Sequence, residues 1–352
     1  MREWEKYVRE VKPYVAGEQP KEKDKIKLNT NENPYPPAPG VEAALKNMDY
    51  SAFTLYPDME AESLVNELSS FYHINSNQIF VGVGSDDVLS MAFLTFFNSP
   101  KPILFPDITY SFYPVWAKVY QINYETPKLD EQFNIRVSDY LRENGGIVIA
   151  NPNAPTSIAM PLSSIEEIVK NNQDSVVIID EAYIDFGGET ALPLIDRYEN
   201  LLVIRTFSKS RSMAGMRIGY AMGNPKLISA IHDIKESINS YTMNTPSIIL
   251  GTQAVKDSEY FYAMLDKVIT TRERIKLELE QIGFICMPSS TNFLFASHKE
   301  ISAKQIFDEL VKNRIFVRYF ATPRIDNFLR ISIGTDQQMD KMMAVLKEIL
   351  KK

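Results

Sequence analysis

Short apolar runs recur between residues 78 and 205 and constrain the fold of this chain more than any other feature. Stretches with apolar residues at helical spacing separate them, for example at 60–71 and 88–97. Strands buried on both faces of a parallel sheet have this pattern, because helices cover each face and keep water from both sides of the strand. We therefore predict an α/β fold in three layers, with a mostly parallel sheet between helices and strands at 78–83, 102–105, 146–150, 175–179 and 201–205.

A smaller α+β unit is expected after the predicted sheet. A long helical stretch at about 247–281 leads into it, and short strands, alternating with helices, are expected near 292–296, 315–318 and 329–333. The last helix carries methionine and leucine residues at amphipathic spacing, which we interpret as core packing. The start of the chain mixes charges with prolines and indicates an arm. The predicted division is an N-terminal arm at 1–30, a large domain at 31–246 and a small C-terminal domain at 247–352.

Composition and charge exclude several classes of protein. The net charge is −7, from 38 Lys and Arg against 45 Asp and Glu, and a negative chain opposes nonspecific binding to nucleic acid. The single cysteine, Cys286, excludes an internal disulfide, and the three histidines lack metal-ligand spacing, so we expect no metal site. No run of about eighteen apolar residues predicts a membrane span, and the charged amino terminus is unlike a signal peptide. We expect a cytoplasmic protein that binds neither nucleic acid nor membrane.

Polar residues follow four of the predicted strands at the point where each strand ends. In open parallel sheets a ligand binds beyond the carboxyl ends of the strands. Asn151 and Asp180 are 29 residues apart, and Asp180 and Lys209 are again 29 apart, which is about one strand-helix-strand unit. The junctions should therefore line one edge of the sheet. Their sequences are Gly82-Val83-Gly84-Ser85-Asp86-Asp87, Asn151-Pro152-Asn153-Ala154-Pro155-Thr156-Ser157, Asp180-Glu181-Ala182-Tyr183 and Thr206-Phe207-Ser208-Lys209.

Together, these side chains have the chemistry to hold pyridoxal 5'-phosphate. A buried lysine becomes a nucleophilic amine that forms a Schiff base with an aldehyde. An aspartate that faces a pyridine nitrogen keeps this nitrogen protonated, and a tyrosine can hydrogen-bond a ring oxygen. The Gly84-Ser85-Asp86 turn at a helix amino terminus offers N–H groups to a phosphate, and Ser208 and Arg217 can complete the cup. The sequence therefore predicts pyridoxal 5'-phosphate as the cofactor.

Several motifs, in family order along nearly the whole chain, resemble those of a known family. Ser208-Lys209 followed by Ala214–Tyr220 resembles the lysine signature of class II aminotransferases of fold type I. Asp180–Phe186 resembles the aspartate-tyrosine motif of histidinol-phosphate aminotransferases. Four further segments are similar to landmarks of that family, namely Leu28–Pro37, Tyr56-Pro57-Asp58, Thr109-Tyr110-Ser111 and Leu329-Arg330-Ile331. The ordered set is far more specific than any single motif.

The resemblance implies a role for each matching residue. Lys209 would hold the cofactor and move a proton, Asp180 would pair with the ring nitrogen, and Tyr183 would bind the ring oxygen. Tyr110 would stack on the ring. The phosphate would be bound by Ser85, Asp86, Ser208 and Arg217, and by Tyr56 of a neighbouring subunit, which makes a homodimer necessary. Substrate would be bound by Arg330, Arg318, Tyr14 and Asn33.

One junction departs from the family pattern. Members of the family usually read Asn-Pro-Asn-Asn-Pro-Thr-Gly there, whereas this chain has Ala154 at the position of the cofactor-binding asparagine and Ser157 in place of the glycine. Either Asn153 or Asn151 takes over the bond to the ring oxygen, or Tyr183 makes it alone. Of these alternatives we favour Asn153.

The resemblance implies transamination between histidinol phosphate and 2-oxoglutarate, a step of histidine biosynthesis, with small molecules as the only partners besides a second subunit. Two other activities use the same scaffold, namely threonine-phosphate decarboxylation and aromatic amino-acid transamination. The bond that is cleaved depends on which substituent lies perpendicular to the cofactor ring, and the sequence leaves this open. A DNA-binding regulator built on this scaffold would carry an added domain or a large basic patch, and we expect neither.

Overall fold

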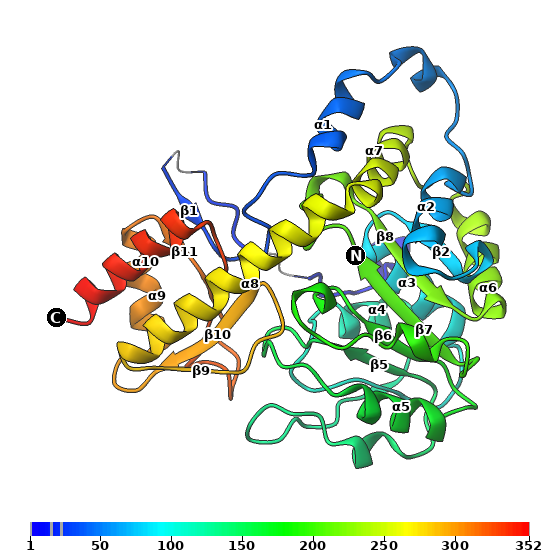
Figure 1. Cartoon of the computed structure of the whole chain (residues 1–352). Coiled ribbons are helices and arrows are strands. Elements are labelled where there is room, and N and C mark those ends of the chain that lie inside the picture. The colour runs from blue at the N-terminus through cyan, green and yellow to red at the C-terminus, as the bar shows by residue number, and fades with distance from the viewer. Residues whose placement is uncertain (1, 15–16, 22–23, 352) are drawn as a thin grey trace.

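The computed structural model describes residues 2–14, 17–21 and 24–351 of the chain, which form a larger and a smaller unit joined by a long helix (Figure 1). The larger unit contains a seven-stranded sheet with the order β2-β8-β7-β6-β5-β3-β4. Strands β3 to β7 pair in parallel, and β8 is antiparallel to both β2 and β7. The strands are β2 (Ile79–Gly82), β3 (Ile103–Leu104), β4 (Tyr124–Glu125), β5 (Ile147–Ala150), β6 (Val177–Asp180), β7 (Leu201–Thr206) and β8 (Gly219–Gly223).

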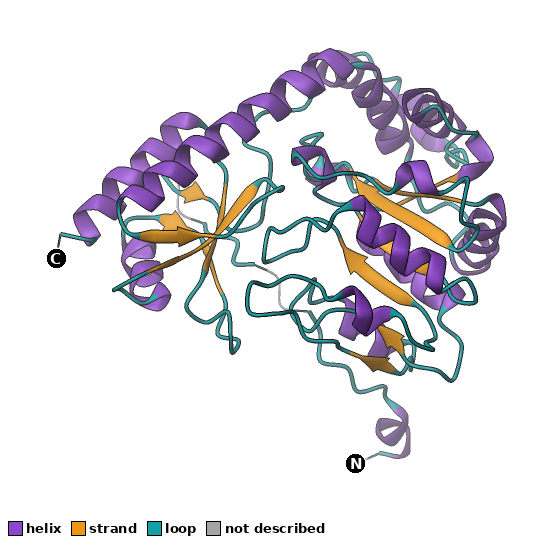
Figure 2. Ribbon diagram, turned by 60° about the horizontal axis from the view of Figure 1, so that its bottom comes forward, coloured by secondary structure: helices purple, strands orange, loops and turns teal. Residues whose placement is uncertain are grey.

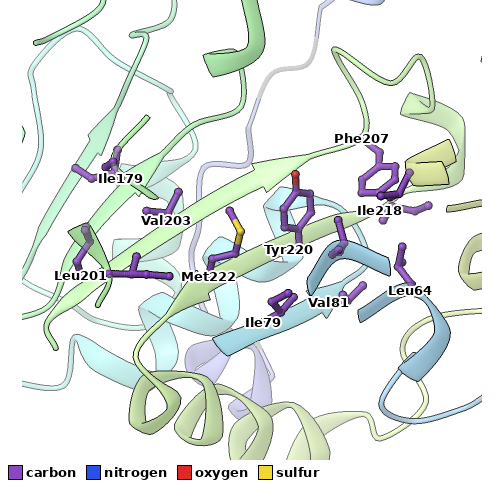
Figure 3. Packing of buried hydrophobic residues seen from close by; sticks show 14 of the residues in the cluster. Leu64, Ile79, Val81, Ile179, Leu201, Val203, Phe207, Ile218, Tyr220 and Met222 are labelled. Atoms are coloured by element: carbon purple, nitrogen blue, oxygen red, sulfur yellow. The ribbon is translucent and has the colours of Figure 1, made fainter. Parts of the chain in front are cut away.

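Helices cover both faces of this sheet, as the sequence predicted (Figure 2). On β5, β6 and β7, odd-numbered residues such as Ile179 and Val203 pack with α2, α5 and α7 (Figure 3), whereas even-numbered residues such as Ile178 and Leu202 pack with α3, α4 and α6. This alternation is the two-residue period of a strand buried on both faces. The helices are α1 (Pro39–Lys46), α2 (Glu62–Tyr72), α3 (Ser85–Phe96), α4 (Tyr113–Val119), α5 (Leu162–Asn171), α6 (Pro225–Ile238) and α7 (Thr245–Lys256).

Strand β8 was not predicted from the sequence. Its sequence, Gly-Tyr-Ala-Met-Gly, has no continuous run of large apolar residues. The glycine at its start is required by packing, because a Cβ on Gly219 would lie 2.3 Å from the backbone of Gly84 and Ser85. This close approach brings the end of β8 against the turn that precedes α3.

The smaller unit has a four-stranded antiparallel sheet with the order β12-β13-β10-β9, covered by helices that enclose a second core. Its methionines Met339, Met342 and Met343 are buried, which confirms their predicted packing role. In a separate pair, β1 (Ile26–Lys27) lies parallel to β11 (Ile315–Phe316). The remaining elements are β9 (Phe284–Cys286), β10 (Phe293–His298), β12 (Arg318–Tyr319), β13 (Leu329–Ser332), α8 (Ser258–Gln281), α9 (Ala303–Lys312) and α10 (Asp336–Ile349).

The predicted three-layer α/β fold with a smaller α+β unit is confirmed, whereas two predicted elements are each divided. The long helical stretch is two helices, α7 and α8, that meet at Asp257, whose carboxylate accepts a hydrogen bond from the Gly40 N–H at 2.8 Å. The strand predicted at 315–318 is two short strands in different sheets. The division at residues 30 and 246 stays a prediction.

Short 3-10 helices fill several of the connections, namely η1 (Glu3–Tyr7), η2 (Tyr50–Thr54), η3 (Ser76–Gln78), η4 (Val137–Tyr140), η5 (Ile184–Phe186), η6 (Leu192–Leu194) and η7 (Ala214–Met216). Among the described residues, no helix combines the length and the apolar character that a membrane crossing needs.

Candidate active site

A cavity of about 250 Å³ lies beyond the carboxyl ends of β5, β6 and β7, where the two units face each other. The ends of the parallel strands form its floor, and β12 and β13 of the smaller sheet contribute two arginines. Most of the predicted site residues line it, namely Tyr14, Ser85, Asp86, Tyr110, Asp180, Tyr183, Ser208, Lys209, Arg217, Arg318 and Arg330. The structure therefore brings together residues that are more than 300 positions apart in the sequence.

Lys209 lies in the turn after β7, where the chain leaves the sheet. Its Nζ donates a hydrogen bond to the carbonyl oxygen of Thr30 at 3.1 Å and lies 5.6 Å from the ring centroid of Tyr183. Asn33 holds the backbone of this turn, because its Nδ2 donates to the carbonyl oxygens of Lys209 at 3.1 Å and Ser210 at 3.3 Å. The amine is thus directed into the cavity by a backbone fixed from the side of residues 30–33.

Asp180 ends β6 and is buried in the cavity floor. Its carboxylate accepts hydrogen bonds from the Tyr113 hydroxyl at 2.8 Å and from the Ala182 N–H at 3.2 Å. Burial raises the pKa of Asp180 to about 6, because desolvation outweighs these two bonds. Both donors are neutral, so a cationic group placed here would bind favourably. Tyr113 was not among the predicted site residues, and it is 67 residues from Asp180 along the chain.

A cup with a cationic rim forms where β8 meets the start of α3. Nη2 of Arg217 lies 3.3 Å from the Asp86 carboxylate, and Nη1 lies 3.5 Å from the Ser208 hydroxyl. Gly84 precedes α3 with a φ of +85°, and a Cβ there would lie 2.5 Å from Arg217. Only glycine therefore lets the guanidinium approach the helix amino terminus. A helix amino terminus beside a guanidinium and a serine is suited to a phosphate.

Two arginines face the cavity from the smaller sheet. Arg330 of β13 lies opposite Arg318 of β12 in the strand register. Nη2 of Arg330 donates to the carbonyl oxygen of Asn29 at 2.9 Å, whereas its Nε is buried without a hydrogen-bond partner among the described residues. Burial lowers the pKa of Arg330, and the charge of Arg318 lowers it further. An anion in the cavity would offset both effects.

Comparison with known proteins identifies the family. The family model described as "Aminotransferase class I and II" matches residues 23–346. The chain belongs to this family. It is 52% identical over 348 residues to a histidinol-phosphate aminotransferase of Clostridium acetobutylicum, covering 99% of both chains, and 49% identical to one of Lactococcus lactis subsp. cremoris, covering 99% of this chain and 98% of that one.

Solved structures have the same fold as this aminotransferase. The histidinol-phosphate aminotransferase of Sinorhizobium meliloti, solved in complex with pyridoxal-5'-phosphate, superposes with a TM-score of 0.84 at 24% identity and covers 93% of this chain and 91% of that one. The enzyme of the same name solved from Clostridium acetobutylicum also gives a TM-score of 0.84 at 24% identity, with coverage of 93% and 99%.

Asn153 of the aminotransferase lies outside the cavity, contrary to the role that we favoured. Its Nδ2 donates to the carbonyl oxygen of Ile108 at 2.9 Å and to the Thr156 hydroxyl at 2.8 Å, and its Oδ1 accepts from the Thr109 hydroxyl at 2.8 Å. The amide is therefore fully used by its own loop and by the segment that follows β3. In the cavity, the Tyr183 hydroxyl accepts a hydrogen bond from Asn31 at 2.9 Å.

The contacts of three further residues can be compared with their predicted roles. The alternative that Tyr183 binds the ring oxygen without Asn153 fits the contacts better, with Asn31 as its hydrogen-bond donor. Asn33, predicted to bind substrate, instead supports the backbone of Lys209. Tyr56 is 82% exposed and stacks on Tyr241 at 4.7 Å between ring centroids, away from the cavity of its own chain. Asn31 lies in the Leu28–Pro37 landmark, which was the only signal that could have found it.

Proposed function

We propose that this aminotransferase exchanges an amino group between histidinol phosphate and 2-oxoglutarate, with pyridoxal 5'-phosphate bound in the cavity. The names and near-complete coverage of the curated relatives support the substrate assignment. One observation of the structure carries it, namely that Arg330 and Arg318 line the same cavity as Lys209, and that Arg330 keeps a buried Nε without a hydrogen-bond partner among the described residues. Both proposed substrates are anions, and guanidinium groups bind phosphate and carboxylate through charge-assisted hydrogen bonds.

The residues of the cavity fit the cofactor. The Lys209 amine can attach its aldehyde, and the cup of Ser85, Ser208 and Arg217 can hold its phosphate. Asp180 fits the ring nitrogen, because its buried carboxylate has a raised pKa and only neutral donors. When bound, the cofactor supplies a ring that withdraws electrons from the substrate carbon.

The protein's own groups perform the remaining tasks. The Lys209 amine takes the proton from Cα of the amino donor and returns a proton during the transfer. The Asp180 carboxylate stabilises a positive charge in the part of the site that lies opposite Lys209. Arg330 and Arg318 bind the phosphate of the donor and then the carboxylate of the 2-oxo acid, so that one anion site serves both half-reactions.

Amino transfer by the purified protein tests this proposal. With histidinol phosphate and 2-oxoglutarate, we expect glutamate to form at least about tenfold faster than with tyrosine or phenylalanine as the donor. Phosphothreonine serves as the control for decarboxylation. Carbon dioxide release from phosphothreonine, or equal rates with all donors, would contradict the assignment and favour one of the two alternative activities.

A homodimer and a cytoplasmic location belong to the same proposal. Tyr50, Phe53, Leu55 and Tyr56 form an exposed apolar patch around η2, and patches of this kind mark protein interfaces. We propose that a second copy binds at this patch and that Tyr56 reaches the cavity of the partner subunit. The single cysteine fits a reducing compartment. Sedimentation velocity would give the mass of a dimer, and a monomer at micromolar concentration would contradict it.

A further inference from the structure

A buried ionic network lies at the same edge of the sheet as the cavity, on the face that α2 covers. Side chains alternate between the two faces of a strand. Asp180 and Thr206 line the cavity, so their neighbours Glu181 and Arg205 point to the other face, toward α2. Both are buried, with Arg205 5% and Glu181 1% exposed.

Arg205 is the centre of this network. Its Nε lies 2.9 Å from the Glu181 carboxylate, and its Nη1 lies 3.4 Å from the Asp185 carboxylate and 3.1 Å from the Tyr72 hydroxyl. Glu181 also accepts hydrogen bonds from the Thr190 hydroxyl and from a backbone N–H. The polar atoms of this ion pair are therefore satisfied within the protein.

The network connects the two turns that carry the reactive groups. Glu181 directly follows Asp180, and its N–H donates to the carbonyl oxygen of Ile204 at 2.7 Å. At the other end, Asp185 accepts a hydrogen bond at 2.6 Å from the hydroxyl of Ser210, which directly follows Lys209. A short chain of charge-assisted hydrogen bonds thus joins the turn after Asp180 to the turn that carries Lys209. It runs through Glu181, Arg205, Asp185 and Ser210.

Stability alone does not account for such a network. Removing two charges from water costs about as much as their attraction returns, so buried ion pairs are often matched by apolar residues of similar volume. Hydrogen bonds to charged groups are directional, however, and they fix the orientation of the segments that they join. A site that needs an amine and a carboxylate in one relative geometry benefits from such a link.

We propose that Arg205, Asp185 and Ser210 are positioning residues that set the direction of the Lys209 amine relative to Asp180. The inference rests on the proposed function for the identity of the cofactor. None of the three side chains lines the cavity, so they act through the backbone of the Lys209 turn. Together with Asn33, which holds the same turn from the side of residues 30–33, they clamp this backbone between two segments.

The test compares Ser210→Ala, Asp185→Ala and the double variant with the wild type. Ser175→Ala is the matched control, because Ser175 makes a similar half-buried bond to Asn144 at 2.8 Å just before β6, away from the cavity. Each holoenzyme is titrated with pH while the absorbance of the cofactor bound at Lys209 is recorded, and kcat and KM are measured with 2-oxoglutarate. Hydrogen exchange of the Met213 amide, which bonds to the Phe207 carbonyl across this turn, is measured in the cofactor-free proteins.

We expect both single variants to lower kcat roughly 10- to 100-fold with KM within about twofold, because small displacements of a reacting group have effects of this size. The midpoint of the absorbance titration should shift, and the Met213 amide should exchange roughly tenfold faster. Ser175→Ala should change none of these. The double variant should match Asp185→Ala, because that variant already removes the Ser210–Asp185 bond together with the contact to Arg205.

Three results would overturn the proposal, namely multiplicative losses in the double variant, unchanged titration and exchange, or the same losses in Ser175→Ala. The titration and the exchange need no amino donor. Failure of the histidinol phosphate assignment, seen as no turnover by a wild type with normal cofactor absorbance, is therefore distinguishable from failure of the positioning role.

Discussion

The clearest test of the site is the substitution Asp180→Asn in the cofactor-free protein. An asparagine keeps the shape of the side chain and can bond both neutral donors, since the Tyr113 hydroxyl is able to accept as well as donate. The change removes only the ionisable group. Because Asp180 is buried, its charge destabilises the fold until a cation binds beside it.

The magnitude follows from the pKa. Asp180 has a pKa of about 6 in the folded protein, against an ordinary value of 3.8. Between these two values the folded protein binds a proton that the unfolded chain has lost, so stability falls as the pH rises from about 4 to about 6 and stays low above it. At about 1.36 kcal/mol for each pH unit, the loss is about 3 kcal/mol. A neutral amide at this position has no such loss, so Asp180→Asn should be more stable than the wild type by up to about 3 kcal/mol at neutral pH.

Urea unfolding of both cofactor-free proteins, at equal concentration and at several values between about pH 4 and pH 8, measures this difference. Other titrating groups are common to both proteins and cancel in the comparison. The free energies of unfolding should coincide near pH 4 and separate progressively up to about pH 6 to 7. A difference that is independent of pH, or a variant that is less stable at pH 8 than the wild type, would refute the reasoning. With the cofactor, the variant should lose at least about 100-fold in amino transfer, because it no longer supports a positive ring nitrogen.

Three further predictions concern the other parts of the site. Arg330→Gln should raise the KM for 2-oxoglutarate roughly 10- to 100-fold in steady-state kinetics, because it removes a charged donor, whereas the exposed Arg314→Gln should not. Gly84→Ala should weaken the affinity for pyridoxal 5'-phosphate roughly tenfold or more in a fluorescence titration, because its Cβ would meet the guanidinium of Arg217; unchanged affinity would place the phosphate elsewhere. Tyr56→Ala and Lys209→Ala should each be inactive, and mixing them with subunit exchange should restore up to about a quarter of the wild-type activity, because half of the dimers then contain one intact site. No recovery would argue against a shared site.

Much of the fold and the centre of the site could be predicted from the sequence for physical reasons. Strands buried on both faces must be apolar throughout, so they were visible as runs, and a parallel sheet then puts Asp180 and Lys209 at the same edge. Strand β8 was not visible, because it is built for close approach of backbones through Gly219. The two strands at 315–319 were merged, since each is only two residues long.

Contacts between distant segments could not be predicted. Tyr113 reaches Asp180 over 67 positions, and Asn31 reaches Tyr183 over 152 positions. No local pattern marks such partners, because each is an ordinary tyrosine or asparagine until the fold brings it into place. Asn153 was assigned a role by its position in a motif, whereas its side-chain atoms are used by Thr156 in the same loop and by Thr109 and Ile108, which lie 44 and 45 positions away. A polar residue in a motif binds a ligand only if the loop leaves its atoms free.

Whether the protein leaves polar atoms free also distinguishes the two groups of buried charges at this edge of the sheet. Glu181 and Arg205 satisfy each other on the side of α2, although they are as buried and as charged as the groups in the cavity. On the cavity side, Asp180 has only neutral donors and Arg330 keeps a buried Nε without a partner among the described residues. Unmatched buried charges destabilise a protein, so they persist where a ligand matches them. We therefore propose that the charges that the fold leaves unmatched form the binding site, and that the matched pair one residue away belongs to the scaffold that aligns it.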